Sequence, residues 1–237
     1  ALANNHVLDW GYAGLTETLS SLRQAGIKTS GAGMNLQEAL TPAILDIGRQ
    51  ARVLVLSCGS PTSGIPPTWA ATGDRAGLWL LKDFSAQTVA GIARRVQSLK
   101  REGDLLVLSI HWGGNWGYHI PHQQRRFAHA LIDEAGVDLV HGHSSHHPKG
   151  IEVYHDRLIL YGCGDFLNDY EGIRSHENFR GDLTLMYLPK LDPRNGRLLS
   201  VHMQAMQIRR FRLQHASQAD TQWLAYVLDS EGKKLGT

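Results

Sequence analysis

Cysteine is scarce in this sequence of 237 residues, which contains Cys58 and Cys163 and no others. Two cysteines so far apart give neither the CxxC pairs of a structural zinc site nor the disulfide framework of a small secreted domain. Each one closes an apolar run, "RVLVLSC" and "LILYGC". We therefore expect two partly buried free thiols rather than a disulfide or a metal-binding pair.

A strong net charge and long apolar runs are also missing. The 24 basic and 22 acidic residues leave a formal net charge of +2. This balance gives no electrostatic basis for binding nucleic acid or an anionic membrane. No apolar run approaches the roughly 20 residues that a membrane-spanning helix needs. With 42% hydrophobic and 19% charged residues, the composition is that of a globular protein, and we predict a single domain over residues 1–237.

The two ends of the sequence lack the usual marks of a complete chain. There is no initiator Met, the polar cluster "ANNH" stands almost at the start, and "DSEGKKLGT" closes the sequence without a recognisable helix cap. We expect a fragment that is truncated at the N-terminus and at the C-terminus. A targeting segment could lie outside it, so the sequence leaves a cytoplasmic and a cell-envelope location equally open.

Strand and helix patterns alternate in the front half, and strands dominate the back half. Apolar spacing and end signals predict helices at 12–25, 85–100 and 122–136, and a weaker helix at 35–45. Apolar runs predict strands at 27–33, 51–60, 104–114, 137–143, 181–189 and 198–213, and a hairpin at 150–165. Residues 60–81, rich in proline and glycine, are expected to form a long loop. The order predicts a mixed α/β domain with a parallel part followed by an antiparallel part.

Histidine is what the sequence has in excess. Nine of the 13 histidines lie between His111 and His155, and "HGHSSHH" holds four in seven residues. In α/β folds, ligands bind beyond the carboxyl ends of the strands, which is where the pattern places "HWGGNWGYH" and "HGHSSHH". We therefore predict that His111, His143 and His146 bind a divalent metal, for which Zn, Mn and Fe are all chemically suitable. Gly142 is expected to let the backbone turn or approach a neighbour closely.

The remaining histidines are expected to have lesser roles. His147 precedes Pro148 and is interpreted as a surface group or a neighbour of the ligands. A separate group of histidines is expected to be simply solvated: His119, His122, His129, His155, His176, His202 and His215. Asp165 and Asp169 could serve as acids.

Five ordered segments resemble the CapA family of capsule-synthesis proteins linked to poly-γ-glutamate. They are "LANNHVLDWGYAGLTETLSSLRQAGI", "GAGMNLQEA", "LVLSIHWGGNWGY", "QRRFAHALIDEAGVDLVHGHSSHHPKGIEVY" and "LILYGCGDFLND". The resemblance runs from about Leu2 to Tyr187. It implies a fold similar to the calcineurin-like metallophosphoesterases, a two-sheet β-sandwich flanked by helices in α/β/β/α layers, with two metal ions.

The resemblance also implies a role for individual residues. Asn5, His111, His143 and His146 would be metal ligands. His6 would face the scissile phosphate oxygen, and Asp9 would orient it. Residues expected to line the substrate pocket are Asn4, Trp112, Asn115, Asp165 and Phe166.

Two departures from the family pattern stand out. The family's opening Gly-Asp and Asn-Leu-Glu blocks, which would supply carboxylate ligands, are not in the sequence. In addition, two residues separate His143 from His146, where phosphoesterases have one residue between the equivalent histidines.

Three functions follow as alternatives. The first is a metal-dependent hydrolase of phosphoester or related polymer linkages in capsule synthesis. The second is a non-catalytic component that binds an anionic polymer or other capsule-synthesis proteins. Arginine pairs could serve that second function: Arg94, Arg95, Arg125, Arg126, Arg209 and Arg210. The third is a metal-dependent amidase that cuts γ-glutamyl linkages.

Overall fold

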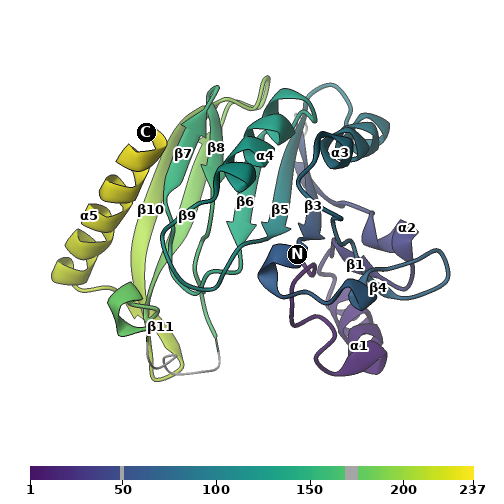
Figure 1. Cartoon of the computed structure of the whole chain (residues 1–237), viewed down its shortest axis with the longest axis horizontal. Coiled ribbons are helices and arrows are strands. Elements are labelled where there is room, and N and C mark those ends of the chain that lie inside the picture. Colours follow the sequence, from purple (N-terminus) through teal and green to yellow (C-terminus); the bar gives the residue numbers. More distant parts are fainter. Residues whose placement is uncertain (49–50, 169–175) are drawn as a thin grey trace.

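A computed structural model of the chain describes residues 1–48, 51–168 and 176–237. The acid candidate Asp169 lies outside these residues. Figure 1 shows two sheets side by side, with helices on the outside and the chain's first helix at one end. The predicted mixed α/β domain with two packed sheets and flanking helices is confirmed.

The larger sheet has six strands in the order β2-β3-β5-β6-β8-β7. Its strands are β2 (Ala43–Ile47), β3 (Ala51–Gly59), β5 (Asp104–His111), β6 (Leu139–His143), β7 (Ile151–Tyr154) and β8 (Arg157–Leu160). The four central strands run parallel, while β2 and β7 pair antiparallel at the edges. All four parallel strands therefore point their carboxyl ends to the same edge.

Two helices cover one face of this sheet (Figure 1). They are α3 (Ala86–Leu99) and α4 (His122–Asp133). Ser85 caps α3 as predicted, since its hydroxyl accepts a hydrogen bond from the Thr88 amide at 3.3 Å. Buried side chains of both helices, such as Ile92 and Leu131, join the alternate strand residues in one core. Burial of this apolar stripe, rather than helix propensity, holds the helices in place.

The second sheet packs on the opposite face of the first. It has the order β11-β10-β9, with β9 (Leu183–Leu191), β10 (Leu198–Arg209) and β11 (Arg212–His215). Tyr187 of β9 packs against Leu139 and Leu158 of the larger sheet. Leu183 and Leu185, on the same face of β9 by their alternate spacing, pack against Leu224 of α5 (Gln218–Leu235). One face of β9 therefore contacts both the larger sheet and this last helix.

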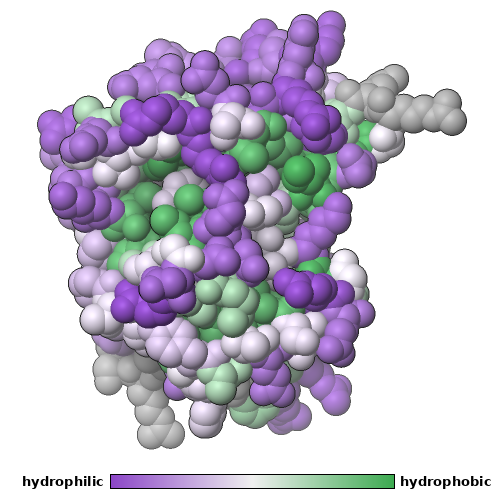
Figure 2. Space-filling model, turned by 90° about the vertical axis from the view of Figure 1, so that its right-hand side faces the viewer, coloured by the Kyte–Doolittle hydropathy of each residue, from purple (hydrophilic) through white to green (hydrophobic). Residues whose placement is uncertain are grey.

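A smaller layer completes the other end of the molecule. It contains α1 (Gly11–Gln24), α2 (Leu36–Ala39), the short strands β1 (Ala32–Gly33) and β4 (Gly77–Leu78), and the 3₁₀ helices η1 (Pro61–Ser63) and η2 (Pro67–Trp69), whereas η3 (Glu177–Phe179) precedes β9. Figure 2, a view onto this end, shows hydrophobic residues interrupted by hydrophilic ones rather than one continuous apolar patch. Beneath the surface, Leu15, Leu19 and Leu78 share a separate small core.

Several elements differ from the sequence prediction. Residues 43–47 form edge strand β2 instead of ending a helix, because pairing with β3 outweighs the weak helical spacing. The strand expected at 27–33 is reduced to Ala32–Gly33. The single strand expected at 198–213 turns at Arg210 and Phe211, whose φ values are positive. Helix α5 was not predicted, and the expectation of an uncapped end is wrong because Gly236, at φ 84°, caps it.

A buried carboxylate ties α5 to the rest of the fold. Glu152 of β7 is 3% exposed and accepts hydrogen bonds from Arg125 at 2.7 Å and from the Tyr161 hydroxyl at 2.7 Å. Arg125 also donates to the backbone carbonyl of Leu235. Together these contacts join α4, β7, the end of β8 and the last turn of α5.

Both cysteines are free and buried, as the sequence predicted. Within the described part of the chain, none of the helices combines the length and the apolar character required to cross a membrane.

We expect Gly142→Ala to destabilise the fold, because a Cβ there would lie 2.5 Å from the Trp112 indole nitrogen and 2.6 Å from the carbonyl oxygens of Leu160 and Tyr161. Overpacking of this kind costs about 1–3 kcal/mol. The close approach predicted for Gly142 is thereby confirmed. The matched control is Gly91→Ala in α3, where the nearest atom would lie 3.9 Å away and the change should stabilise by about 0.5–1 kcal/mol. Urea unfolding measures both, and equal effects at the two positions would contradict this view of Gly142.

Candidate functional site

The candidate site begins with two strands that lie side by side. In the parallel register of β5 and β6, Ser109 pairs with His141 and His111 pairs with His143. Alternate residues of a strand share one face, so all four side chains lie on the face opposite α3 and α4. Nearer the amino ends of the two strands this face is apolar, at Val107 and Leu139. It becomes polar toward their carboxyl ends. The four residues are called the histidine centre below.

Hydrogen bonds connect the histidine centre into one chain. The Ser109 hydroxyl lies 3.0 Å from His141 Nδ1 and 3.0 Å from His143 Nε2. His143 Nδ1 lies 2.9 Å from His111 Nδ1. His111 Nε2 is buried and has no hydrogen-bond partner among the described residues. A buried polar atom without a partner is uncommon and calls for an explanation such as a bound ion.

The imidazoles of the histidine centre are held neutral. Burial, helped by the positive charges of nearby His6 and His146, lowers the pKa of His111 to about 4. Burial and the neighbouring His141 hold the pKa of His143 well below its usual value. Burial also lowers the pKa of His141. Neutral imidazole is the form that binds metal ions.

The protons along these hydrogen bonds can be arranged in two ways. With both rings neutral, one of the two Nδ1 atoms that face each other must carry the proton. If His111 carries it, His143 donates from Nε2 to Ser109, and His111 Nε2 presents a free lone pair. If His143 carries it, Ser109 donates to His143, and His111 Nε2 is an N–H without an acceptor. The first arrangement leaves a buried lone pair of the kind that ligates a metal.

Two histidine–carboxylate pairs stand beside the centre. His6 Nδ1 lies 2.8 Å from Asp9 Oδ2, and His146 Nδ1 lies 2.8 Å from Asp165 Oδ2. The first pair is open to solvent, with side-chain exposures of 66% and 48%, whereas the second is largely enclosed at 15% and 22%. A carboxylate on one ring nitrogen fixes the tautomer and directs the other nitrogen outward.

The turn between His143 and His146 is strained. Ser144 has φ 125°, a region that residues with a side chain rarely adopt. Its hydroxyl donates to the Gly113 carbonyl at 3.0 Å, and the His146 amide donates to the Asn115 carbonyl at 3.0 Å. Strain of this kind persists where surrounding contacts over-determine it and is frequent at functional sites.

The chemistry of these donors suits a divalent metal, but the described residues do not form a complete set of ligands. Neutral imidazoles and the unpartnered nitrogen of His111 suit such an ion. His143 already uses both ring nitrogens and could bind a metal only by giving up Ser109 or His111. Within residues 1–48, 51–168 and 176–237, no three His, Cys, Asp or Glu side chains are grouped as a metal site requires. A further donor or a local rearrangement is therefore needed to complete a site.

The residues expected to bind substrate are placed unevenly. Asn115 and Asp165 lie beside His146, and Phe166 is 44% exposed nearby in the chain. Asn4 accepts a hydrogen bond from the His6 amide at 2.9 Å, whereas Asn5 is half-buried and makes no contact that supports its role as a ligand. Trp112 is 2% exposed and donates to the Tyr161 carbonyl on the helix-covered face. It is a core residue, and we no longer expect it to touch substrate.

An aromatic cluster borders His146 and was not expected. Trp116 stacks on His176 with ring centroids 4.3 Å apart and lies 5.4 Å from His146. His147 is fully buried and stacks on Phe179 at 4.8 Å, so its interpretation as a surface group is wrong. Three histidines expected to be merely solvated also have partners. His176 stacks on Trp116, His129 bonds Glu152, and His155 lies 3.0 Å from Asp133 through Nδ1.

Sequence reasoning also missed Ser109 and His141. The signal was present, because the period-2 pattern of "LSIH" and "LVHGH" puts each residue on the same face as the following histidine. The segment 60–81, which was predicted to be one long loop, contains η1, η2 and the short strand β4, and its first residues lie against this site. Its Ser63 hydroxyl donates to the His111 carbonyl at 3.0 Å.

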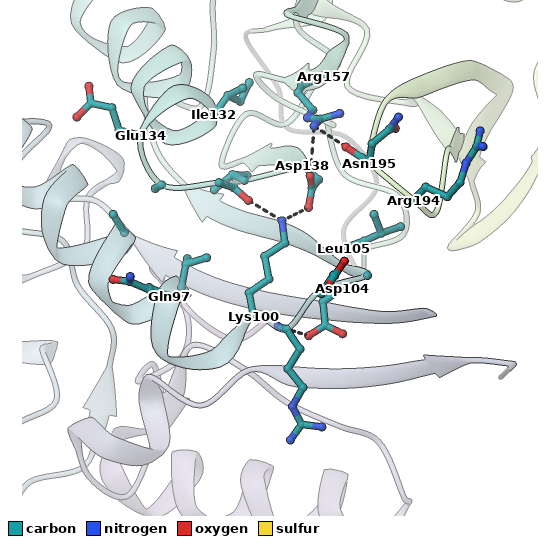
Figure 3. Close-up of a pocket in the computed structure, with 18 of the residues that line it drawn as sticks. Gln97, Lys100, Asp104, Leu105, Ile132, Glu134, Asp138, Arg157, Arg194 and Asn195 are labelled. Carbon is teal, nitrogen blue, oxygen red and sulfur yellow. Dashed lines mark hydrogen bonds and ion pairs between the residues drawn. The ribbon is translucent and has the colours of Figure 1, made fainter. Parts of the chain in front are cut away.

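A different cavity of about 780 Å³ lies at the amino ends of β5 and β6, and Figure 3 shows its charged lining. Lys100 donates to Asp138 at 2.6 Å and to the Gly136 carbonyl at 2.9 Å. Arg157 bonds the Asn195 carbonyl at 2.5 Å and lies 3.7 Å from Asp138. Most of these charges are paired with one another, although Arg157 Nη1 is buried without a hydrogen-bond partner among the described residues.

Lowering the pH should weaken the chelator-treated fold between about pH 6.5 and 4. Burial lowers the pKa of His147, like that of His111, to about 4, whereas an unfolded histidine titrates near 6.5. The unfolded chain therefore takes up protons first, and the free energy of unfolding falls by up to about 3 kcal/mol for each group. Below about pH 4 the loss from these two groups levels off.

Urea unfolding at pH 7 and pH 4.5 measures this loss. His147→Phe is the informative variant, because it keeps a ring beside Phe179 and removes the titrating group. Its difference in stability between the two pH values should be smaller than that of the wild type. An identical difference would show that His147 does not contribute.

Comparison with known proteins identifies relatives of the chain. The pattern of the family described as "Bacterial capsule synthesis protein PGA_cap" matches residues 1–170. A Mycobacterium tuberculosis protein named "Probable polyglutamine synthesis accessory protein" is 49% identical over 237 residues, which cover 100% of this chain and 62% of the relative. The chain thus spans about three-fifths of that relative's length.

Two more distant similarities were also found. The capsule biosynthesis protein CapA of Bacillus anthracis is 26% identical over 177 residues, covering 75% of this chain and 41% of the relative. A crystal structure described as that of a novel phosphatase from Mycoplasma pneumoniae aligns with a TM-score of 0.42 and 9% identity, covering 70% of this chain and 57% of that chain. From the matched family pattern and the 49% identity, the chain belongs to the bacterial capsule synthesis family PGA_cap, as its resemblance to CapA proteins had indicated.

Proposed function

We propose that the chain is a metal-dependent hydrolase of phosphoester or related polymer linkages that acts as an accessory protein in capsule or polyglutamate synthesis. The observation that carries this proposal is the buried, unpartnered Nε2 of His111 beside neutral His143, at the carboxyl ends of two parallel strands. Membership of the family and the names of the relatives support the biological setting. Two metal ions, with Zn, Mn or Fe as candidates, remain part of the proposal.

Each residue near the histidine centre has a separate proposed role in binding the metal. His111, His143 and His146 would hold metal, and Asp165 would orient His146. Asn5 would be a further ligand. A divalent metal held there would act as a Lewis acid on a phosphoryl or carbonyl oxygen.

We assign the movement of a proton to His6. Asp9 occupies its Nδ1, and the ring is 66% exposed, so Nε2 is directed away from the carboxylate and can meet a substrate. A protonated imidazole in this position can donate a proton to a leaving group. Asn4, Asn115 and Phe166 are proposed to contact the substrate around this point.

The two other functions have less support. The polymer-binding alternative relied on arginine pairs, but Arg95 donates to the Leu40 carbonyl at 3.0 Å and Arg125 is paired with Glu152. Cleavage of a γ-glutamyl amide would use the same metal and proton donor. A phosphonate inhibitor and a γ-linked peptide substrate separate that reaction from phosphoester hydrolysis.

Metal content provides the first test. We expect the full-length protein to bind up to two metal ions per chain, and His111→Ala and His143→Ala to reduce this number, because each removes a buried neutral donor. His202→Ala, an exposed histidine of β10, is the matched control and should change nothing. Elemental mass spectrometry on folded protein makes the measurement. Unchanged metal content in both site variants would refute the metal assignment.

A role for His6 as proton donor predicts a dependence on the leaving group. His6→Gln should slow hydrolysis of a phenyl phosphoester by about 10²–10⁴-fold, the usual contribution of a general acid. Hydrolysis of the p-nitrophenyl ester should change much less, since its leaving group needs no proton. Asp9→Asn should show the same pattern in weaker form. An equal loss of kcat for both esters would assign His6 a different role.

A further inference from the structure

A second cavity opens from the histidine centre into the space between the two sheets. It has a volume of about 510 Å³, within the roughly 300–1,000 Å³ typical of small-molecule sites. His141 and His143 form part of its wall. The cavity is called the inter-sheet pocket below, and it continues from the proposed reaction site into the core.

Apart from those two histidines, the pocket wall is mainly apolar. Val107, Leu139 and Leu160 come from the larger sheet, and Leu185 and Pro189 come from β9. Phe166 lines the pocket and is 44% exposed, which places it where the pocket meets solvent. Apolar groups that enter such a pocket gain the free energy of leaving water. A ligand that fills it would carry its polar end at the histidines and an apolar end toward the sheets.

Tyr187 is the one residue with a hydroxyl group in the described lining of the pocket. Tyr187 lines the pocket, and its hydroxyl is buried without a hydrogen-bond partner in the described structure. Leaving a buried hydroxyl unpaired is unfavourable. Less than 1 Å² of the hydroxyl oxygen is accessible to solvent, so a ligand could bond to it only after the surrounding side chains shift.

The lining also argues against an anionic polymer as the occupant. None of the described residues that line the inter-sheet pocket is Lys or Arg, and an unpaired carboxylate placed in apolar surroundings is strongly disfavoured. The charged side groups of a glutamate polymer therefore have no counter-charge there. An uncharged apolar chain meets no such penalty.

We propose that the inter-sheet pocket binds the apolar chain of an amphiphilic phosphoester whose phosphate lies at the histidine centre. The position of the phosphate rests on the proposed function, whereas binding of the chain does not. The substrate class is thus narrowed to phosphoesters that carry an alkyl or isoprenoid chain, as a lipid-linked polymer would.

Equilibrium binding of alkyl phosphates tests this inference without turnover. Ethyl, butyl, hexyl and octyl phosphate are titrated by calorimetry, below the concentrations at which they form micelles. Each added methylene should tighten binding about fourfold until the pocket is full, because each is removed from water. Equal dissociation constants across the series would overturn the proposal.

Two pocket variants locate the effect. Val107→Phe should abolish the dependence on chain length by filling the pocket, while Val153→Phe, on the exposed edge strand β7, should leave it intact. Cys163→Leu is a milder change in the same lining and should limit the longest chain accepted, which keeps the test valid if Val107→Phe fails to fold. Full chain-length dependence in both folded pocket variants would place binding elsewhere and refute the proposal.

His111→Ala separates this inference from the proposed function. His111 does not line the pocket, so the variant should bind all phosphates more weakly and keep the same ratio between octyl and butyl phosphate. If the wild type lacks metal and hydrolytic activity but shows the chain-length dependence, the pocket assignment stands and the hydrolase assignment fails. If the protein hydrolyses short-chain esters but chain length has no effect, the hydrolase assignment stands and the pocket assignment fails.

Discussion

The parallel pairing of β5 with β6 is the constraint on which the candidate site depends. Its backbone hydrogen bonds place His111 opposite His143 and Ser109 opposite His141. A slip of one residue would turn each pair toward the helix-covered face. The apolar residues that precede them, Leu106, Leu108 and Val140, are buried under α3 and α4 and keep this register. The core thus positions the polar site through strand alternation alone.

Local signals predicted much of the fold. Helices α1, α3 and α4 and the parallel strands followed from apolar spacing and caps, and the hairpin turn falls at His155 and Asp156, both with positive φ. The errors lie where tertiary contacts decide. Residues 43–47 pair with β3 despite a helical pattern, and α5 is held by Leu224 and by the Arg125–Leu235 contact, neither of which a local pattern reveals.

The residues of the candidate site were easier to predict than the contacts between them. Strand ends rich in histidine pointed to His111, His143 and His146, and the family resemblance added His6 and Asp9. Which nitrogen faces which partner depends on register and rotamers, so the contact between His111 and His143 could not be predicted. Trp112 was misplaced because it follows His111 by one residue, and that single step turns its side chain into the core.

The burial of the two thiols limits their reactivity. Burial raises the pKa of Cys163 to about 12 and that of Cys58 further still. Oxidants and disulfide exchange act on the accessible thiolate, a form that neither cysteine populates near neutral pH. The fold has no disulfide, and its two thiols are buried. Its integrity is therefore expected to be independent of the surrounding redox potential.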